Sequence, residues 1–272
     1  ALVPPLLKHF GLTGTLRAAW LGSAVLCGVQ PFFLALLRPN LAILPYELTA
    51  LSYSFQVLQL GALVVVPVIV ATGLISPLLL RARESADSRT NARHVATLLA
   101  WNGVGGWLGT ELTQNFLAPN FGLWTSVTII GVAYLALGML FELRFDATSP
   151  VTGVRGRMIP LAAATGILLL CGWFTRGLPQ TTLLPGEKLA VVKVGREGVV
   201  ATVACGPGDW RILFNNSYTL GGSKPKFNQE RQGLLPLLLH GNPKSAAALG
   251  VATGGTVAGL ALLPTLARVK AV

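Results

Sequence analysis

Long runs without a charged residue dominate the first two thirds of the chain. An apolar helix of about 20 residues is enough to cross the hydrocarbon core of a bilayer. The run over residues 48–80 exceeds one straight span at about 1.5 Å per residue, so its crossing part is expected at 58–80. The pattern predicts an α-helical membrane domain over residues 1–178, with about five transmembrane helices at 18–37, 58–80, 95–117, 123–141 and 159–174.

The pattern changes after Pro185, where short β-branched runs replace the long apolar ones. Residues 188–193 and 199–204 alternate around Gly195-Arg196-Glu197-Gly198, which is typical of a β-hairpin. A third apolar run at 210–214 follows a Gly-Pro-Gly-Asp turn. We expect a small antiparallel β unit over residues 185–230.

A glycine-rich turn, Gly250-Val251-Ala252-Thr253-Gly254-Gly255, follows the apolar run at 246–251 and precedes another at 256–263. Strand, glycine turn and helix in this order are typical of the first unit of a Rossmann-like α/β domain. Taken alone the glycine turn is weak evidence, because glycines also occur in ordinary turns. We expect the incomplete start of such a domain over residues 231–272.

Composition supports a protein embedded in the lipid bilayer. Charged residues make up 11% and apolar residues 52% of the chain, and the mean hydropathy is +0.62. Soluble domains carry about 25% charged residues. The net charge of +11 comes from arginines placed between apolar runs, so a nucleic-acid partner is not expected.

The arginine-bearing loops at 81–93 and 144–157 predict the side of the membrane. Positively charged loops stay in the cytoplasm, so both loops are expected there. Five spans then place the part after Pro185 on the opposite, periplasmic side.

Few single residues indicate chemistry. Glu111 lies within a predicted span, where an ionisable group suggests a functional role. We favour an interfacial or helix-facing position, because Thr113, Gln114 and Asn115 follow it. Cys27, Cys171 and Cys205 are far apart and show no metal-binding spacing.

The segment LPLLLHGNPKSAAALGVATGG, from Leu235 to Gly255, resembles the signature region of spermidine synthases. The family places Leu-Pro-Leu, a His and Asn-Pro-Lys/Arg before the first strand and glycine loop of a methyltransferase-like fold. The segment YTLGGS and the helices before it are similar to the membrane-bound bacterial subgroup, the fused transporter-like/spermidine synthase proteins. This resemblance implies an integral protein of the bacterial inner membrane.

The resemblance also implies a cofactor and its binding residues. The family transfers the aminopropyl group of decarboxylated S-adenosylmethionine to a diamine, with an aspartate as general base and carboxylates holding the cationic substrate. The residues carried over as cofactor-binding are Glu230, His240, Gly250, Ala252, Gly254 and Gly255. His240 has a second interpretation, a histidine of the turn before the strand.

Several departures from the family pattern leave two functions open. Ala252 replaces the middle glycine of the loop, and Lys224 with Pro225 stand near the family's acidic pair. The ribose-binding acid, expected about 20 residues beyond the turn, falls past Val272. No catalytic residue is therefore expected within these residues, and the chain is expected to be part of a longer one.

The first function is a membrane-anchored, spermidine synthase-like protein, with a polyamine substrate only if the catalytic half exists. The alternative is a non-catalytic accessory subunit that packs with other subunits of a membrane complex. The predicted periplasmic side conflicts with a cytoplasmic cofactor, so either the short fifth segment does not fully cross the membrane or the part after Pro185 does not carry out cytoplasmic aminopropyl transfer. The lost acidic pair, Ala252 and the missing downstream acids favour the alternative. The helix count alone would also allow a transporter.

Overall fold

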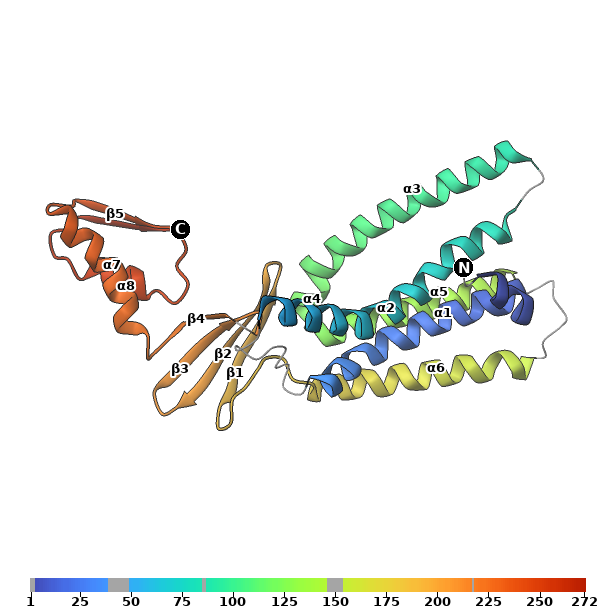
Figure 1. Ribbon diagram of the computed structural model, residues 1–272, viewed down its shortest axis with the longest axis horizontal. Coiled ribbons are helices and arrows are strands. Elements are labelled where there is room, and N and C mark those ends of the chain that lie inside the picture. Colours follow the sequence, from blue (N-terminus) through green and yellow to red (C-terminus); the bar gives the residue numbers. More distant parts are fainter. Residues whose placement is uncertain (1–2, 39–48, 85–86, 146–153, 217) are drawn as a thin grey trace. The chain divides into compact units, whose positions relative to one another are not determined.

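The computed structural model describes residues 3–38, 49–84, 87–145, 154–216 and 218–272. The chain divides into two compact units, Ala1–Pro179 and Gln180–Val272. The first unit is helical, and the second contains all the strands that the structure describes (Figure 1). The further predicted division between 185–230 and 231–272 stays a prediction.

Among the residues that the structure describes, four helices of the first unit are long and apolar enough to cross a membrane. They belong to α1 (Val3–Leu37), α2 (Ala50–Ala82), α5 (Leu123–Phe145) and α6 (Val154–Phe174). Helix α1 begins well before the predicted span, and its backbone is interrupted at Gly11, where φ is 67°. The prediction of a helical unit with helices suited to crossing a membrane is confirmed to this extent.

Helix α3 (Ser88–Leu112) covers most of the remaining predicted span, but it is not among these four. Its four glycines, Asn102 and polar N-terminal turns lower its hydropathy, and none of its residues is buried. It continues through the π-helix η2 (Thr113–Leu117) and the single turn α4 (Ala118–Phe121) into α5. The predicted count of five spans is therefore not confirmed.

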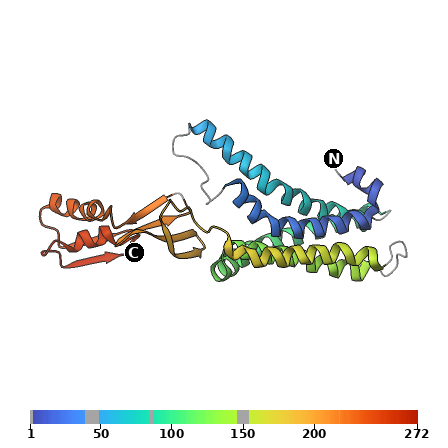
Figure 2. The same ribbon diagram turned by 90° about the horizontal axis from the view of Figure 1, so that it is seen from below.

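The long helices of the first unit alternate in direction, so the ends of successive helices lie at two ends of the bundle (Figures 1 and 2). The end of α2, the start of α3 and the end of α5 lie at one end. The short helix η4 (Thr175–Gly177) lies at the other, and there the indole Nε1 of Trp124 donates to the carbonyl of Pro179 (2.9 Å). The helix ends that flank both arginine-bearing stretches thus lie at the same end of the bundle, while its side of the membrane stays a prediction.

Helix α1 packs against α2, α5 and α6. Its contact with α5 is close because two glycines of α5 face it. A Cβ at Gly131 would lie 2.8 Å from the carbonyl oxygen of Ala24, and one at Gly138 would lie 3.0 Å from Cβ of Trp20. The hydroxyl of Ser23 in this seam donates to the carbonyl of Ala19 in its own helix (2.7 Å). Apolar packing therefore joins these helices.

The second unit begins with an antiparallel sheet of strands in the order β1-β2-β3-β4. The strands are β1 (Lys188–Gly195), β2 (Gly198–Gly206), β3 (Asp209–Phe214) and β4 (Tyr218–Gly222). The register pairs Val194 with Val199 around the predicted turn. The predicted antiparallel sheet is confirmed, and β4 is a strand that the apolar pattern did not predict.

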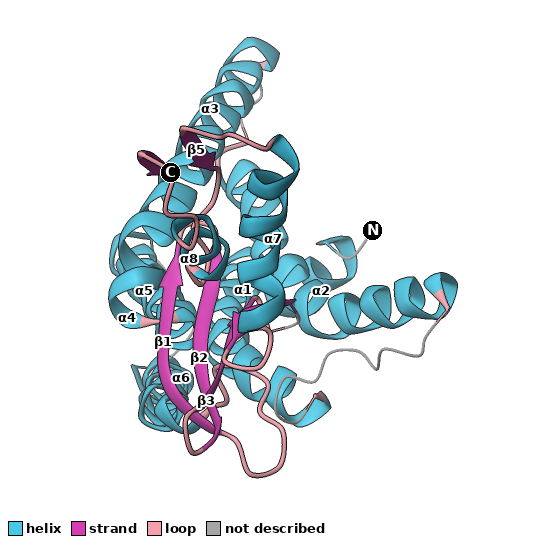
Figure 3. Cartoon of the chain, turned by 90° about the vertical axis from the view of Figure 1, so that its left-hand side faces the viewer, coloured by secondary structure: helices cyan, strands magenta, loops and turns pink. Residues whose placement is uncertain are grey.

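The rest of the second unit contains α7 (Lys226–His240), β5 (Ser245–Ala248), α8 (Gly255–Ala261) and β6 (Arg268–Ala271). Strands β5 and β6 pair in parallel, with Ala246 opposite Val269. Figure 3 shows α7 beside α8. One β-α-β unit is less than a Rossmann-like domain, so that wider prediction stays a prediction.

Helices α7 and α8 touch backbone to backbone through one glycine in each. A Cβ at Gly233 would lie 2.1 Å from the carbonyl oxygen of Thr256, and one at Gly259 would lie 2.0 Å from that of Glu230. Leu237 of α7, Ala248 of β5 and Leu260 of α8 form a buried core next to these helices. The position of α8 over the parallel strands therefore depends on both glycines.

Gly259→Ala should loosen this contact, because the added methyl group can only be placed by moving the helices apart. Overpacking of this kind costs about 1–3 kcal/mol. We expect amide hydrogen exchange in α8 and β6 of the full chain to become at least several-fold faster, as measured by mass spectrometry. Gly206→Ala is the matched control, since a Cβ there meets nothing within 4 Å. Unchanged exchange in Gly259→Ala would contradict the packing.

Candidate functional site

The glycine turn between β5 and α8 has the backbone conformation that its sequence suggests. Gly250 and Gly254 have φ of 83° and 79°, and Ala252 has φ of 45°. The amide of Gly254 donates to the carbonyl of Val251 (2.7 Å). A left-handed conformation costs a non-glycine residue about 1–2 kcal/mol. Ala252 therefore adopts a conformation that favours glycine. It stands at the position where the family that the sequence resembles has a glycine.

Gln229 of α7 fixes this turn to the antiparallel sheet. Its side-chain Nε2 donates to the carbonyl of Leu220 in β4 (3.2 Å), and its Oε1 accepts from the hydroxyl of Thr253 (2.8 Å). A Cβ at Gly221 would lie 2.2 Å from Nε2 and one at Gly255 would lie 2.6 Å from Oε1. The two glycines thus leave the space that the Gln229 amide fills.

Glu230 lies next to Gln229 on α7 and close to α8. Its carboxylate pairs with Lys226 one helical turn earlier, at 3.7 Å, and its side chain is 25% exposed. Its backbone is the part that touches Gly259. The structure therefore brings Glu230 near the helix that follows the glycine turn, with the carboxylate held by a lysine.

His240 is the last residue of α7 and lies apart from Glu230. Ten residues of helix separate the two by about 15 Å along the axis. The exposed side chain of His240 lines a cavity of about 650 Å³ that also involves Lys244, Ala246 and Thr256. Gly250, Ala252, Gly254, Gly255 and Glu230 are not part of its lining. The structure thus gathers the predicted residues into two places, and their cofactor roles stay predictions.

A carboxylate cluster in the antiparallel sheet was not predicted. Oε2 of Glu187 accepts from Nη2 of Arg211 (2.6 Å) and from the amide of Leu184 (2.8 Å), while Oε1 accepts from the thiol of Cys205 (3.2 Å). The Glu187 side chain is only 7% exposed. It joins the segment before β1 to β2 and β3.

Burial and hydrogen bonding shift the pKa values of Glu187 and Cys205 in this cluster. Burial by itself raises the pKa of the Glu187 carboxyl, but the hydrogen bonds from Leu184 and Cys205 and the charge and hydrogen bond of Arg211 hold it below its ordinary value. Burial, followed by the hydrogen bond to Glu187 and its charge, raises the pKa of the Cys205 thiol. A protonated thiol is a poor nucleophile, so the cluster is suited to holding the sheet together rather than to covalent chemistry.

Glu111 of α3 lies partly exposed beside η2. Its Oε2 accepts from Nδ2 of Asn115 at 2.6 Å. An apolar groove of about 600 Å³ lies between the glycine-bearing part of α3 with η2 and the facing side of α5, but Glu111 does not line it. The hydrogen bond from Asn115 gives the Glu111 carboxylate a partner one helical turn away. This is consistent with the interfacial or helix-facing position that we favour from the sequence.

No group of three or more His, Cys, Asp or Glu side chains could hold a metal ion within the residues that the structure describes. The three cysteines are all free thiols. No protein-family model, no curated protein and no solved structure matches this chain. The local geometry of the glycine turn and its neighbours is therefore the basis for a functional proposal.

Glu187→Gln should destabilise the antiparallel sheet at neutral pH by about 1.5–3 kcal/mol, because hydrogen bonds to charged groups contribute about that much. A lowered folded-state pKa means that the contribution is complete above the ordinary value of 4.5 and is lost as pH falls below it. The free energy of unfolding of the wild-type sheet should therefore fall more steeply in acid than that of Glu187→Gln.

Urea unfolding measured by reaction of Cys205 with dithiodipyridine, which works in acid, tests this pH dependence. Cys27 and Cys171 lie in α1 and α6, outside the sheet, and are changed to Ser in both proteins. Glu197→Gln, in the exposed β1–β2 turn, is the control and should match the wild type. If the free energy of unfolding depended on pH in the same way in Glu187→Gln and in the wild type, the stabilising role of the Glu187 cluster would be contradicted.

Proposed function

We propose that this chain is a membrane-anchored, spermidine synthase-like protein whose second unit binds decarboxylated S-adenosylmethionine or a related nucleoside. The observation that carries the proposal is the glycine turn at 250–255, which joins β5 to α8 in the β-α-β unit and has three residues with positive φ. Such a turn lets a ligand approach the backbone closely. The order of elements, from β-hairpin sheet through α7 to strand, turn and helix, is the order that the resemblance implies.

The ligand chemistry follows from Glu230 and the turn. Decarboxylated S-adenosylmethionine carries a sulfonium and an amine, both cationic, so a partly buried carboxylate suits it. Glu230 is such a group, and its present partner Lys226 is exposed and lies at the long distance of 3.7 Å. In the family's reaction the neutral amine of a diamine displaces the sulfonium sulfur from the aminopropyl carbon, so that a C–N bond forms, the C–S bond breaks, the sulfur leaves as a thioether and the new ammonium loses a proton. These residues would contribute binding and orientation, and no catalytic base is assigned.

A second candidate, a non-catalytic accessory subunit, is favoured by one observation on α3. None of its residues is buried, and a Cβ on any of its four glycines would meet nothing within 4 Å. Glycines that are spaced like Gly105 and Gly109 let membrane helices approach closely. Copurification of the tagged chain with a stoichiometric membrane protein, lost on Gly105→Leu, would support this candidate.

Calorimetric titration of the full chain in detergent with decarboxylated S-adenosylmethionine tests the first candidate. We expect saturable binding that Glu230→Gln weakens by about tenfold or more, because it removes a charge-assisted contact. Glu197→Gln is the matched control, since it removes the same charge in an exposed turn. Absence of saturable heat in the wild-type chain would refute the cofactor proposal.

A further inference from the structure

The antiparallel sheet of the second unit has two faces that differ in burial. Residues that lie directly opposite each other on paired strands point to the same face of a sheet. One face contains Ala201, Val203 and Leu213, which are buried. The other, here called the outer face, has three rows of residues across β1, β2 and β3, which lie side by side in Figure 3. The rows are Lys188, Ala204 and Trp210; Val191, Thr202 and Ile212; and Lys193, Val200 and Phe214.

The outer face is largely apolar, although the described residues leave it exposed. Val191, Val200 and Trp210 are 53%, 37% and 45% exposed, and Ile212 and Phe214 are half-buried. An antiparallel sheet with one face in water usually alternates apolar and polar residues, so that the wet face is polar. Contiguous exposed apolar surface is typical of a place where a protein or a membrane binds. The outer face therefore requires a partner.

The charges of the outer face favour an anionic partner. Lys188 and Lys193 each stand at the end of a row, and both are exposed. The three rows contain no carboxylate. Two acids of the sheet lie close by, but Asp209 pairs with Lys224 (3.1 Å) and Glu187 is only 7% exposed. The outer face therefore combines apolar side chains with positive charge that no acid of its rows offsets.

This combination favours a lipid surface over a second copy of the chain. Two outer faces brought together would bury the lysines of both copies without carboxylates to pair with them, and an unpaired buried charge is costly. At a bilayer surface Lys188 and Lys193 keep their ammonium groups among the headgroups while their methylene stems cover apolar surface. Tryptophan is enriched at the same depth, which suits Trp210.

The chain before β1 is a short tether to the helical bundle. The carbonyl of Pro179 accepts a hydrogen bond from the indole of Trp124 in α5, which holds this point of the chain at one end of the bundle. Lys188 follows nine residues later, and a chain of that length spans at most about 30 Å. A short tether gives a second contact a high effective concentration, so modest affinity for lipid is sufficient.

We infer that the outer face docks onto the headgroup layer of a bilayer that contains anionic phospholipid. Trp210, Val200 and Phe214 contact the apolar part of that layer, and Lys188 and Lys193 contact phosphate groups. Docking holds the second unit in one orientation toward the bilayer. None of the residues of the glycine turn belongs to the outer face, so this inference is independent of the proposed cofactor site.

Amide hydrogen exchange of the full chain in lipid nanodiscs tests the docking, because a covered face slows exchange in the edge strand β1. Deuterium uptake of β1 is measured by mass spectrometry in phosphatidylcholine discs with and without phosphatidylglycerol. We expect phosphatidylglycerol to slow wild-type uptake at least several-fold. Lys188→Gln and Lys193→Gln should each weaken docking by about fivefold, the contribution of one basic residue near an anionic surface. Trp210→Ser should weaken it by about tenfold, because a large apolar side chain is lost.

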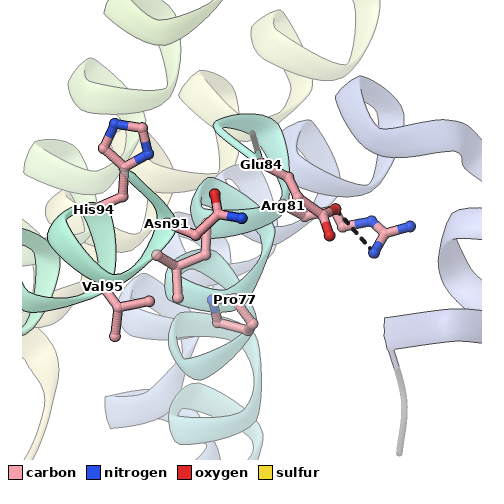
Figure 4. Close-up of a pocket in the computed structure, with 7 residues that line it drawn as sticks. Pro77, Arg81, Glu84, Asn91, His94 and Val95 are labelled. Carbon is pink, nitrogen blue, oxygen red and sulfur yellow. Dashed lines mark ion pairs between the residues drawn. The ribbon is translucent and has the colours of Figure 1, made fainter. Parts of the chain in front are cut away.

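Two variants are matched controls that should respond to phosphatidylglycerol as the wild type does. Lys270→Gln removes the same charge from β6, outside the antiparallel sheet. Arg81→Gln removes a positive charge at the other end of the bundle, where Figure 4 shows Arg81 paired with Glu84 (3.0 Å) and apart from His94.

Three outcomes would overturn the docking. An equal loss of the response in Lys270→Gln and Lys193→Gln would indicate diffuse attraction by net charge. A wild-type uptake that is the same with and without phosphatidylglycerol would exclude the anionic surface. Slow uptake that appears only in discs with two copies of the chain would assign the outer face to a second copy.

Discussion

The arrangement of the first unit depends on a surrounding that covers apolar surface. Helix α2 exposes Leu51, Phe55, Leu58 and Ile69 along its length. Water would make so much exposed apolar surface very unfavourable. A bilayer removes that penalty and at the same time requires every backbone N–H and C=O to bond within its own helix. Long helices with apolar outer faces are the structure that meets both conditions.

The second unit is held together by contacts of a different kind. Gln229 links β4 to the glycine turn, and Glu187 links the start of the sheet to Arg211. Each link joins a polar side chain to partners on other elements of the unit, and each is partly buried. The sheet and the β-α-β unit therefore have fixed positions within the unit, which is what a binding turn needs in order to keep its shape.

The sequence predicted the elements whose signals are local. Charge-free runs indicated α1, α2, α5 and α6, and the Gly195–Gly198 turn indicated the pairing of β1 with β2. The start of α1 was missed because Lys8 and Arg17 interrupt the apolar run, although charged residues near a helix end do not stop it from being helical. Helix α3 was expected to cross the membrane, but its glycines and polar turns leave it outside the four candidate spans.

The candidate site was predictable only in part, for a similar reason. The glycine turn could be recognised because its residues are consecutive. The bond between Thr253 and Gln229 and the pair of Glu187 with Arg211 each join residues 24 positions apart, and no periodic pattern marks them. The separation of His240 from Glu230 follows from their positions along α7, which the motif alone did not reveal.

The seam between α1 and α5 has a consequence for how this protein can vary. Gly131 and Gly138 bring the two helices together, and the hydroxyl of Ser23 is satisfied within its own helix. The contacts at Gly131, Gly138 and Ser23 involve no charged side chain, so ionic strength has little direct effect on them. The seam is sensitive to side-chain volume instead, because a methyl group added at Gly131 would meet backbone of α1 and one added at Gly138 would require Trp20 to move.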